Sequence, residues 1–364
     1  MRKTLARVPS LFVVSTEGYA GKTAVCLGLA LKMKEKGYKV GYFRPIGLEM
    51  ARTPNGKPID EDAVLMNETL ELKLPLETIV PMTLCSRFLE ECSKVEPKIF
   101  LEKIESAYAK VSEGKDILII EGLNRLEDCT FMELSSPTLA KKFESKVLTV
   151  SRAATDTVVD LILRDKKCIQ AEGATFIGAI LNYVPRQILE KVKEIAVSIL
   201  EKRNAKVWGV IPEDVRLTAP TAREIHEKLG GEILACETKM DNFIEDFLVG
   251  AMTAESSLKY FRRTVNKAVI TGGDRADLAL AALETSTSAL ILTGNLYPSV
   301  KVLVRAEEQG VPVLLVPYDT YTAVQLLSKI AGRIKPRDMK KIELAKQFIE
   351  TNVNWEGILK TILP

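Results

Sequence analysis

Gly21, Lys22 and Thr23 form the clearest chemical motif in the sequence. An apolar run at 11–15 precedes them and a helical pattern at 23–36 follows, which is the strand–loop–helix context of a phosphate-binding P-loop. Backbone N–H groups of such a loop bind phosphates, and Lys22 would neutralise the β- and γ-phosphates of ATP. The predicted nucleotide-binding residues of this loop are Thr16, Glu17, Gly18, Tyr19, Ala20, Gly21, Lys22 and Thr23.

One position of the loop departs from the strict P-loop pattern. Thr16 stands where that pattern requires glycine. Two alternatives therefore remain open: a working nucleotide site, or a loop that retains only the fold.

Acidic residues in two other segments would complete a Mg²⁺ site with the Thr23 hydroxyl. Glu121 directly follows the predicted strand 116–120, and an acid at the carboxyl end of a parallel strand faces the ligand crevice of the sheet. Asp60 and Asp62 precede a helical run, and Asp62 is the preferred candidate of the two. These two acids are either metal ligands or only a helix-start cluster stabilised by the helix dipole. Because Mg²⁺ prefers oxygen ligands, we predict Thr23, Asp62 and Glu121 as its ligands.

An open α/β sheet is predicted to position these residues. Apolar and β-branched residues fill both faces of short runs, which is typical of parallel strands buried on both sides. Helical patterns alternate with them, so we predict a P-loop NTPase-like, mostly parallel sheet with flanking helices over residues 1–212. The strands are expected at 11–15, 39–43, 116–120, 146–151, 176–181 and 206–211, and the main helices at 23–36, 100–112, 157–171 and 187–202.

A second, smaller α/β domain is predicted over 213–335, followed by docking helices over 336–364. Its expected strands are 267–271, 289–293 and 312–316, and the first two run into glycine turns before helical patterns. Such turns bring backbone close to another molecule, and helix-start N–H groups favour an anion. Tight turns with Asp274 as a helix cap are the alternative. The candidate ligand or interface residues are Gly272, Gly273, Asp274, Arg275, Thr293 and Gly294.

Composition excludes several classes of protein. The 364 residues carry a net charge of +3, too balanced for a dedicated nucleic-acid binder, and no apolar run reaches the length of a membrane span. The N-terminus shows no signal-peptide cleavage pattern. Six scattered cysteines without a CxxC motif indicate reduced thiols in a cytoplasmic protein. A single histidine, His226, cannot build a histidine metal cluster.

With these motifs in order, the first half resembles dethiobiotin synthetases and, more closely, the N-terminal region of long phosphotransacetylases. The resemblance implies that Thr23, Asp62 and Glu121 hold Mg²⁺ and that Asn182 recognises adenine, although Asn182 is alternatively a turn residue before Pro185. Besides the loop, the segments that carry the resemblance are 40–47, 62–63, 121–122 and 178–184.

The second half resembles the DRTGG domain, which occurs beside regulatory nucleotide-binding modules and inside long phosphotransacetylases. Together the two resemblances cover roughly residues 8–335. The matching segments of the second half are 211–214, 219–224, 270–277 and 292–295.

Departures from both families concern the substrate end. Arg44 replaces a lysine of dethiobiotin synthetases, and arginine is not equivalent to lysine because its planar fork binds anions in two-pronged fashion. The segment 123–126 replaces a glycine-rich stretch, and we expect no catalytic phosphotransacetylase domain after residue 364. We therefore expect neither dethiobiotin synthesis nor acetyl transfer.

Two functions fit this pattern. One is an ATP-dependent ligase that phosphorylates a carboxylate, with Lys22 and Arg44 as catalytic residues and Arg125 as a further substrate clamp. The alternative is a nucleotide-binding regulatory or oligomerisation module; an inert scaffold is the third possibility. The predicted cofactors are ATP and Mg²⁺, and the predicted partners are a small acidic substrate or effector and a second copy in a homodimer.

Overall fold

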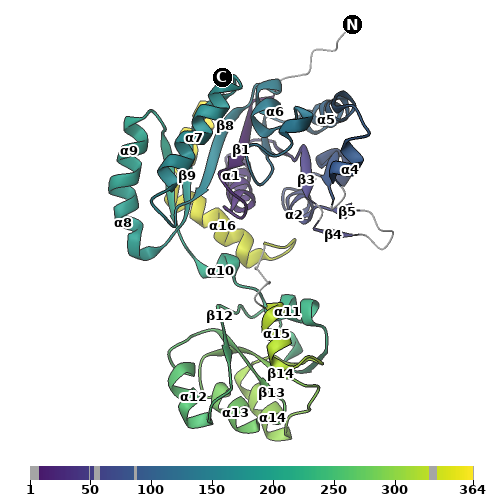
Figure 1. Cartoon of the computed structure of the whole chain (residues 1–364), viewed down its shortest axis with the longest axis vertical. Coiled ribbons are helices and arrows are strands. Elements are labelled where there is room, and N and C mark those ends of the chain that lie inside the picture. Colours follow the sequence, from purple (N-terminus) through teal and green to yellow (C-terminus); the bar gives the residue numbers. More distant parts are fainter. Residues whose placement is uncertain (1–7, 49, 53–57, 86–87, 328–333, 364) are drawn as a thin grey trace. The chain divides into compact units, whose positions relative to one another are not determined.

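The chain divides into two compact units. A computed structural model describes residues 8–48, 50–52, 58–85, 88–327 and 334–363. Unit 1 comprises Met1–Glu213 and Ile334–Pro364, and unit 2 comprises Asp214–Arg333 (Figure 1). The N-terminal residues 1–7, where a signal peptide was not expected, and residues 328–333 of the predicted second domain lie outside the described residues.

Unit 1 is built on a six-stranded parallel sheet with the order β10-β9-β8-β1-β7-β2. The middle strands are apolar and buried on both faces, as the sequence predicts for parallel strands. The α/β prediction is thus confirmed. The strands are β1 (Ser10–Ser15), β2 (Val40–Phe43), β7 (Ile117–Glu121), β8 (Lys146–Arg152), β9 (Thr175–Val184) and β10 (Val207–Pro212).

Helices cover this sheet, and the same unit contains two separate small strand pairs. β3 (Ile46–Leu48) pairs in parallel with β6 (Met82–Leu84), and β4 (Ala51–Arg52) pairs antiparallel with β5 (Pro58–Ile59). The helices are α1 (Lys22–Glu35), α2 (Glu61–Thr69), α3 (Leu76–Ile79), α4 (Phe88–Cys92), α5 (Pro97–Ser112), α6 (Ser136–Lys142), α7 (Val158–Ala171), α8 (Leu189–Lys191), α9 (Val197–Lys202), α16 (Met339–Asn352) and α17 (Trp355–Ile362).

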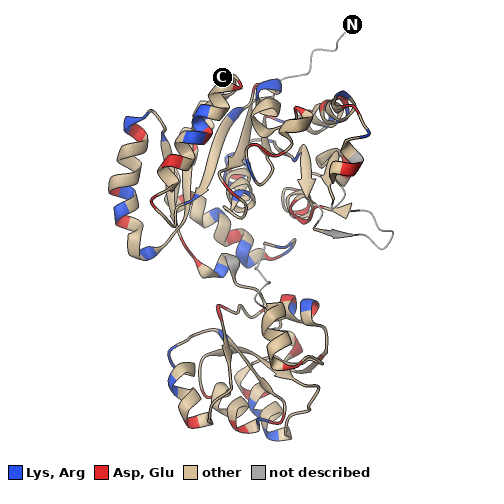
Figure 2. Cartoon of the chain, viewed as in Figure 1, with Lys and Arg blue, Asp and Glu red and all other residues tan. Residues whose placement is uncertain are grey.

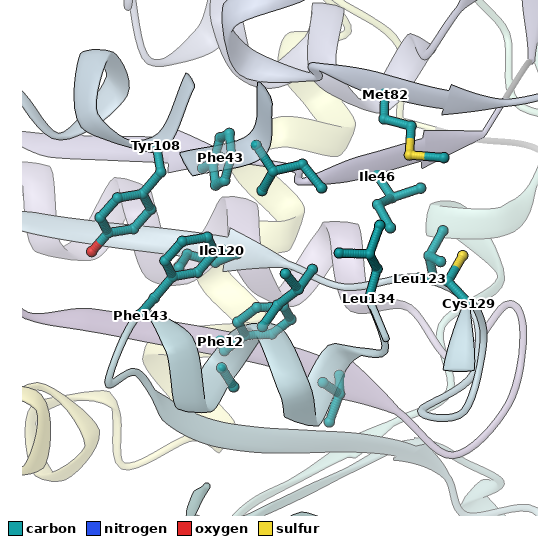
Figure 3. Close-up of a cluster of buried hydrophobic side chains, with 14 of the residues drawn as sticks. Phe12, Phe43, Ile46, Met82, Tyr108, Ile120, Leu123, Cys129, Leu134 and Phe143 are labelled. Carbon is teal, nitrogen blue, oxygen red and sulfur yellow. The ribbon is translucent and has the colours of Figure 1, made fainter. Parts of the chain in front are cut away.

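An aromatic cluster fills the space between the sheet and α5 (Figure 3). Phe12 of β1 and Phe43 of β2 are buried there, and the rings of Tyr108 and Phe143 stack with their centroids 4.2 Å apart. Phe43 meets Tyr108 edge to face at 5.9 Å. Such ring pairs add to the free energy gained from burial. They hold Phe43 at the end of β2, directly before Arg44.

Unit 2 is a five-stranded sheet with the order β11-β15-β14-β13-β12, in which only the edge pair β11–β15 is antiparallel. A capping box begins α11: Thr221 accepts from the Glu224 N–H, and Glu224 accepts from the Thr221 N–H. The elements are α10 (Val215–Thr218), α11 (Ala222–Leu229), β11 (Glu232–Ala235), β12 (Asp246–Val249), α12 (Ala254–Phe261), β13 (Lys267–Gly272), α13 (Ala276–Leu283), β14 (Thr287–Thr293), α14 (Val300–Gln309), β15 (Val313–Leu315) and α15 (Thr320–Leu327).

Charged residues of both signs are spread along the helices of each unit (Figure 2). Among the described residues, no helix combines the length and apolar character that crossing a membrane requires.

Candidate nucleotide-binding site

The phosphate loop joins β1 to α1 at the carboxyl end of the sheet. Gly21 is the N-cap of α1 and has φ 86°, in the left-handed region that favours glycine. A Cβ at Gly21 would overlap the amide of Asn182, so the position also excludes larger residues for lack of space. The loop therefore presents the N-terminus of α1, beginning at Lys22, in the manner of a phosphate site.

Lys22 is buried at the first position of α1, and its Nζ donates to Ser15 Oγ at 2.8 Å. Burial lowers its pKa, while the nearby Glu121 carboxylate acts in the opposite direction. Ser15 was not predicted as a site residue, although its place at the end of β1 could have indicated it. It orients the lysine within the loop.

Arg44 lies at the centre of a buried acidic cluster that reaches this loop. Its Nη1 is 2.8 Å from Glu121 Oε1 and 3.1 Å from Asp62 Oδ2, and its Nε is 2.9 Å from Asp60 Oδ2. The Arg44 side chain is only 2% exposed. Burial lowers the pKa of Arg44, but the three carboxylates, Glu121 first, outweigh burial and raise it, so Arg44 is a permanent cation.

Glu121 connects the cluster to α1. Its Oε1 accepts hydrogen bonds from Thr23 Oγ1 and from Arg44 Nη1, each at 2.8 Å, and its Oε2 accepts from the Tyr42 hydroxyl at 2.9 Å. Tyr42 was not predicted; its strand β2 pairs directly with β7, which brings the two side chains together. Glu121 therefore accepts three side-chain hydrogen bonds within the protein.

Asp60 and Asp62 both contact Arg44, but in different ways. Asp60 is buried and caps α2, accepting from the Ala63 N–H at 3.1 Å and from the Leu48 N–H at 2.8 Å. Burial raises the pKa of Asp60, and Arg44 opposes this shift. Asp62 is the more exposed of the pair.

The predicted Mg²⁺ ligands lie together, yet they do not fit a metal ion as they stand. The Thr23 hydroxyl donates a hydrogen bond to Glu121, and the Arg44 guanidinium contacts both Glu121 and Asp62. Within the described part of the chain, no three acidic, histidine or cysteine residues are grouped so as to hold a metal ion. A cation at these ligands would have to displace Arg44.

Asn182 lies inside β9 and contacts the phosphate loop. Its Nδ2 donates to the backbone oxygen of Ala20 at 2.8 Å. Arg152 lies 5.8 Å from the Tyr183 ring, a cation–π distance. Asn182 thus fixes the loop, and its recognition of adenine stays a prediction.

The predicted substrate end offers little room. The cavity beside Glu121, lined also by Pro45 and Ser136, measures about 10 Å³, which is marginal even for one water molecule. Arg125 is exposed, and its backbone N–H donates to Asp128.

In unit 2 the predicted glycine turns lie side by side at the ends of β13 and β14. A Cβ at Gly273 would overlap the backbone oxygen of Leu296, so Gly273 permits close packing of two loops. A Cβ at Gly272 would lie 2.5 Å from Asp274, and Gly294 has φ 80°. These glycines therefore have structural roles.

Arg275 is engaged inside unit 2. Its Nη2 donates to Asp277 Oδ2 at 2.9 Å and to the Met252 oxygen at 3.1 Å. Arg275, rather than Asp274, is the N-cap of α13. Thr293 Oγ1 lies 2.8 Å from Thr320 Oγ1.

Comparison with known proteins gives two family matches. An AAA domain model matches residues 9–221, and the DRTGG domain model matches residues 224–330. The phosphate acetyltransferase of Nitratidesulfovibrio vulgaris is 26% identical over 363 residues, covering 95% of this chain and 50% of the relative. The chain spans about half the length of the curated relatives it matches.

Solved structures resemble each unit at low TM-scores. The regulatory region of Clostridium perfringens pyrophosphatase, with CBS and DRTGG domains and the activator diadenosine tetraphosphate, gives 0.29 at 22% identity, covering 42% of this chain and 81% of its own. A ParA family ATPase from Chlorobium tepidum gives 0.36 at 13% identity, covering 57% and 85%.

The family matches confirm the resemblance to the N-terminal region of phosphotransacetylases. The chain belongs to the family of the AAA domain that matches residues 9–221, a P-loop nucleotide-binding domain, and joins it to a DRTGG domain.

Proposed function

We propose that this chain is a regulatory module whose phosphate loop binds ATP. Lys22 carries the proposal: it begins α1 inside a P-loop domain, and the neutral Ser15 hydroxyl orients its Nζ beside the loop. A lysine at this position of a P-loop can neutralise the phosphates of a bound nucleotide.

Two features of the substrate end favour regulation over a ligase. Arg44, the predicted clamp, is enclosed by carboxylates that would repel an acidic substrate. The cavity of about 10 Å³ beside Glu121 is itself too small to hold one. The ligase remains the alternative, and the Mg²⁺ predicted at Thr23, Asp62 and Glu121 remains a prediction too.

Calorimetry with ATP tests the proposal. Lys22→Ala should weaken ATP binding at least about tenfold, because the phosphates lose their counter-charge. Lys34→Ala, an exposed position on the same helix, is the matched control and should bind as the wild type does. Failure of the wild type to bind millimolar ATP would contradict the proposal. Phosphate release with added carboxylic acids would favour the ligase.

For unit 2 we propose an interaction role, either with a small acidic effector or in a homodimer. Its match to the DRTGG domain supports this role. Light scattering and thermal shift with nucleotides test it. The proposal for unit 2 would be contradicted by a monomeric protein whose melting temperature nucleotides raise only through binding at the phosphate loop of unit 1.

A further inference from the structure

Arg44 stands where a divalent cation would meet its ligands in unit 1. Glu121, Asp62 and Asp60 supply three carboxylates, and every one lies within 3.1 Å of the same guanidinium. The Arg44 side chain is 2% exposed and that of Glu121 1% exposed, so the centre of the cluster is closed to solvent, while the Asp62 side chain at its edge is 16% exposed. The guanidinium is thus part of the folded core.

Glu121, the central carboxylate of the cluster, already accepts three hydrogen bonds and so has little capacity left for a metal. Both acceptor positions of Glu121 Oε1 are used by Thr23 and Arg44, and Oε2 accepts from Tyr42. Mg²⁺ demands near-octahedral oxygens at about 2.0–2.1 Å. A planar guanidinium tolerates the wider arrangement found here, since its donors point in several directions.

Charge leads to the same conclusion. In their ordinary ionised forms, Lys22 and Arg44 set two positive charges against the three carboxylates of the cluster. A divalent ion added to this cluster would reverse its net charge and would stand beside a buried guanidinium. At the low dielectric constant of a buried site, that repulsion is strong.

We propose that Arg44 is the built-in cation of this site, and that phosphate binding at the loop needs no divalent metal. This inference rests on the proposed ATP binding and specifies its chemistry. Arg44 holds Glu121 and, through it, the Thr23 hydroxyl at the start of α1. The loop is thereby organised for phosphate without Mg²⁺.

The first experiment measures Mn²⁺ alone by electron paramagnetic resonance and needs no nucleotide. At about 100 μM Mn²⁺, the wild type should not bind one Mn²⁺ per chain. This concentration lies well above the dissociation constant expected of a preformed carboxylate site. Arg44→Gln frees the three carboxylates and should gain one Mn²⁺ per chain. Arg186→Gln, which removes an exposed arginine of the same unit, is the control and should behave as the wild type. Stoichiometric Mn²⁺ binding by the wild type would overturn the inference, even if the variant fails to fold.

The second experiment compares ATP affinity in EDTA and in millimolar Mg²⁺ by calorimetry of the wild type. The two dissociation constants should agree within about threefold. Binding at least tenfold tighter with Mg²⁺ would refute the built-in cation but leave ATP binding intact. Absence of ATP binding in both buffers would refute the proposed function and with it the metal-free phosphate binding.

Discussion

Asp165 on α7 is a buried carboxyl group with an incomplete set of partners. Its Oδ1 accepts from Arg164 at 2.8 Å, whereas Oδ2 is buried and has no hydrogen-bond partner among the described residues. Burial raises the pKa of Asp165 to about 6 from its ordinary 3.8, with Arg164 opposing the shift. The folded protein thus binds this proton more tightly than the unfolded chain does.

This difference predicts a pH-dependent effect of Asp165→Asn. The stabilising contribution of the Asp165 proton is complete below about pH 4 and is lost as the pH rises to about 6. Asparagine resembles the protonated form, so the variant should exceed the wild type in free energy of unfolding by about 1–3 kcal/mol at pH 7. Urea unfolding at pH 4 and pH 7 measures this; a gap that does not shrink at pH 4 would contradict it.

Gly21 offers a test of the loop geometry. In Gly21→Ala the new Cβ would overlap the Asn182 amide, in a backbone conformation that alanine rarely adopts. We expect ATP binding to weaken at least about tenfold and the melting temperature to fall. Gly37→Ala is the control, because Gly37 lies outside the loop with φ 95° and a Cβ there would meet nothing within 4 Å, so this variant has the backbone strain without the overlap. Equal losses in both variants would argue against a specific role of Gly21.

The position of single residues could be predicted only where chain neighbours decide it. Lys22 and Thr23 follow a strand and begin a helix, and Glu121 ends a strand, so spacing alone indicated their place. The burial of Arg44 among three carboxylates could not be predicted from the spacing of neighbouring residues. It depends on β2 lying beside β7 and on α2 returning to the same edge, which are contacts between distant segments.

Among the elements, α1 and α16 approach each other closely at Gly28. A Cβ there would overlap the Ile349 side chain and lie 2.7 Å from the backbone oxygen of Ala345. Around this point Lys32 pairs with Glu350 at 3.0 Å. The glycine therefore determines the spacing of two helices that are far apart in sequence.

Gly28→Ala should consequently destabilise unit 1 by about 1–3 kcal/mol, because a backbone atom cannot yield as a side chain does. Thermal unfolding followed by circular dichroism measures the loss. Lys34→Ala on the same helix should change stability by less than about 0.5 kcal/mol. A Gly28→Ala protein as stable as the wild type would show that α16 shifts freely.

The strands of the first sheet were predicted within a few residues, since apolar residues on both faces leave little ambiguity. The short strands β3 to β6 were not predicted, because runs of two or three residues are too short to show a periodic pattern. The edge strands β11 and β12 were not predicted either, because their mixed faces resemble loops. The helix predicted at 187–202 is a helical run that contains a π-helical stretch, Val192–Ala196. Sequence periodicity does not reveal such a change of hydrogen bonding.

For the molecule as a whole, unit 2 is an insertion in unit 1, because the chain leaves unit 1 after Glu213 and returns at Ile334. The returning helices complete the first unit: α16 and α17 pack on α1 and β10, and the Asn354 N–H donates to the Trp208 oxygen at 2.7 Å. The C-terminal segment is thus structural in unit 1.

Removal of residues 334–364 should therefore unfold unit 1 selectively. Ile349, Ile358 and Leu359 are buried, and their loss would expose the apolar surface of α1 and β10. Hydrogen exchange should show lost protection in β1, β7 and β8 but retained protection in β13 and β14. Protection lost equally in both sheets, or in neither, would contradict this arrangement.

The insertion also determines the order in which the protein can fold during synthesis. A ribosome that has completed β10 must translate the 120 residues of Asp214–Arg333 before it reaches the helices that cover α1. At bacterial and eukaryotic elongation rates of about 5–20 residues per second, this interval lasts roughly 6–24 s. Unit 2 can begin to fold on the nascent chain in that time, while α1 and β10 of the earlier-made unit still lack the helices α16 and α17 that pack on them.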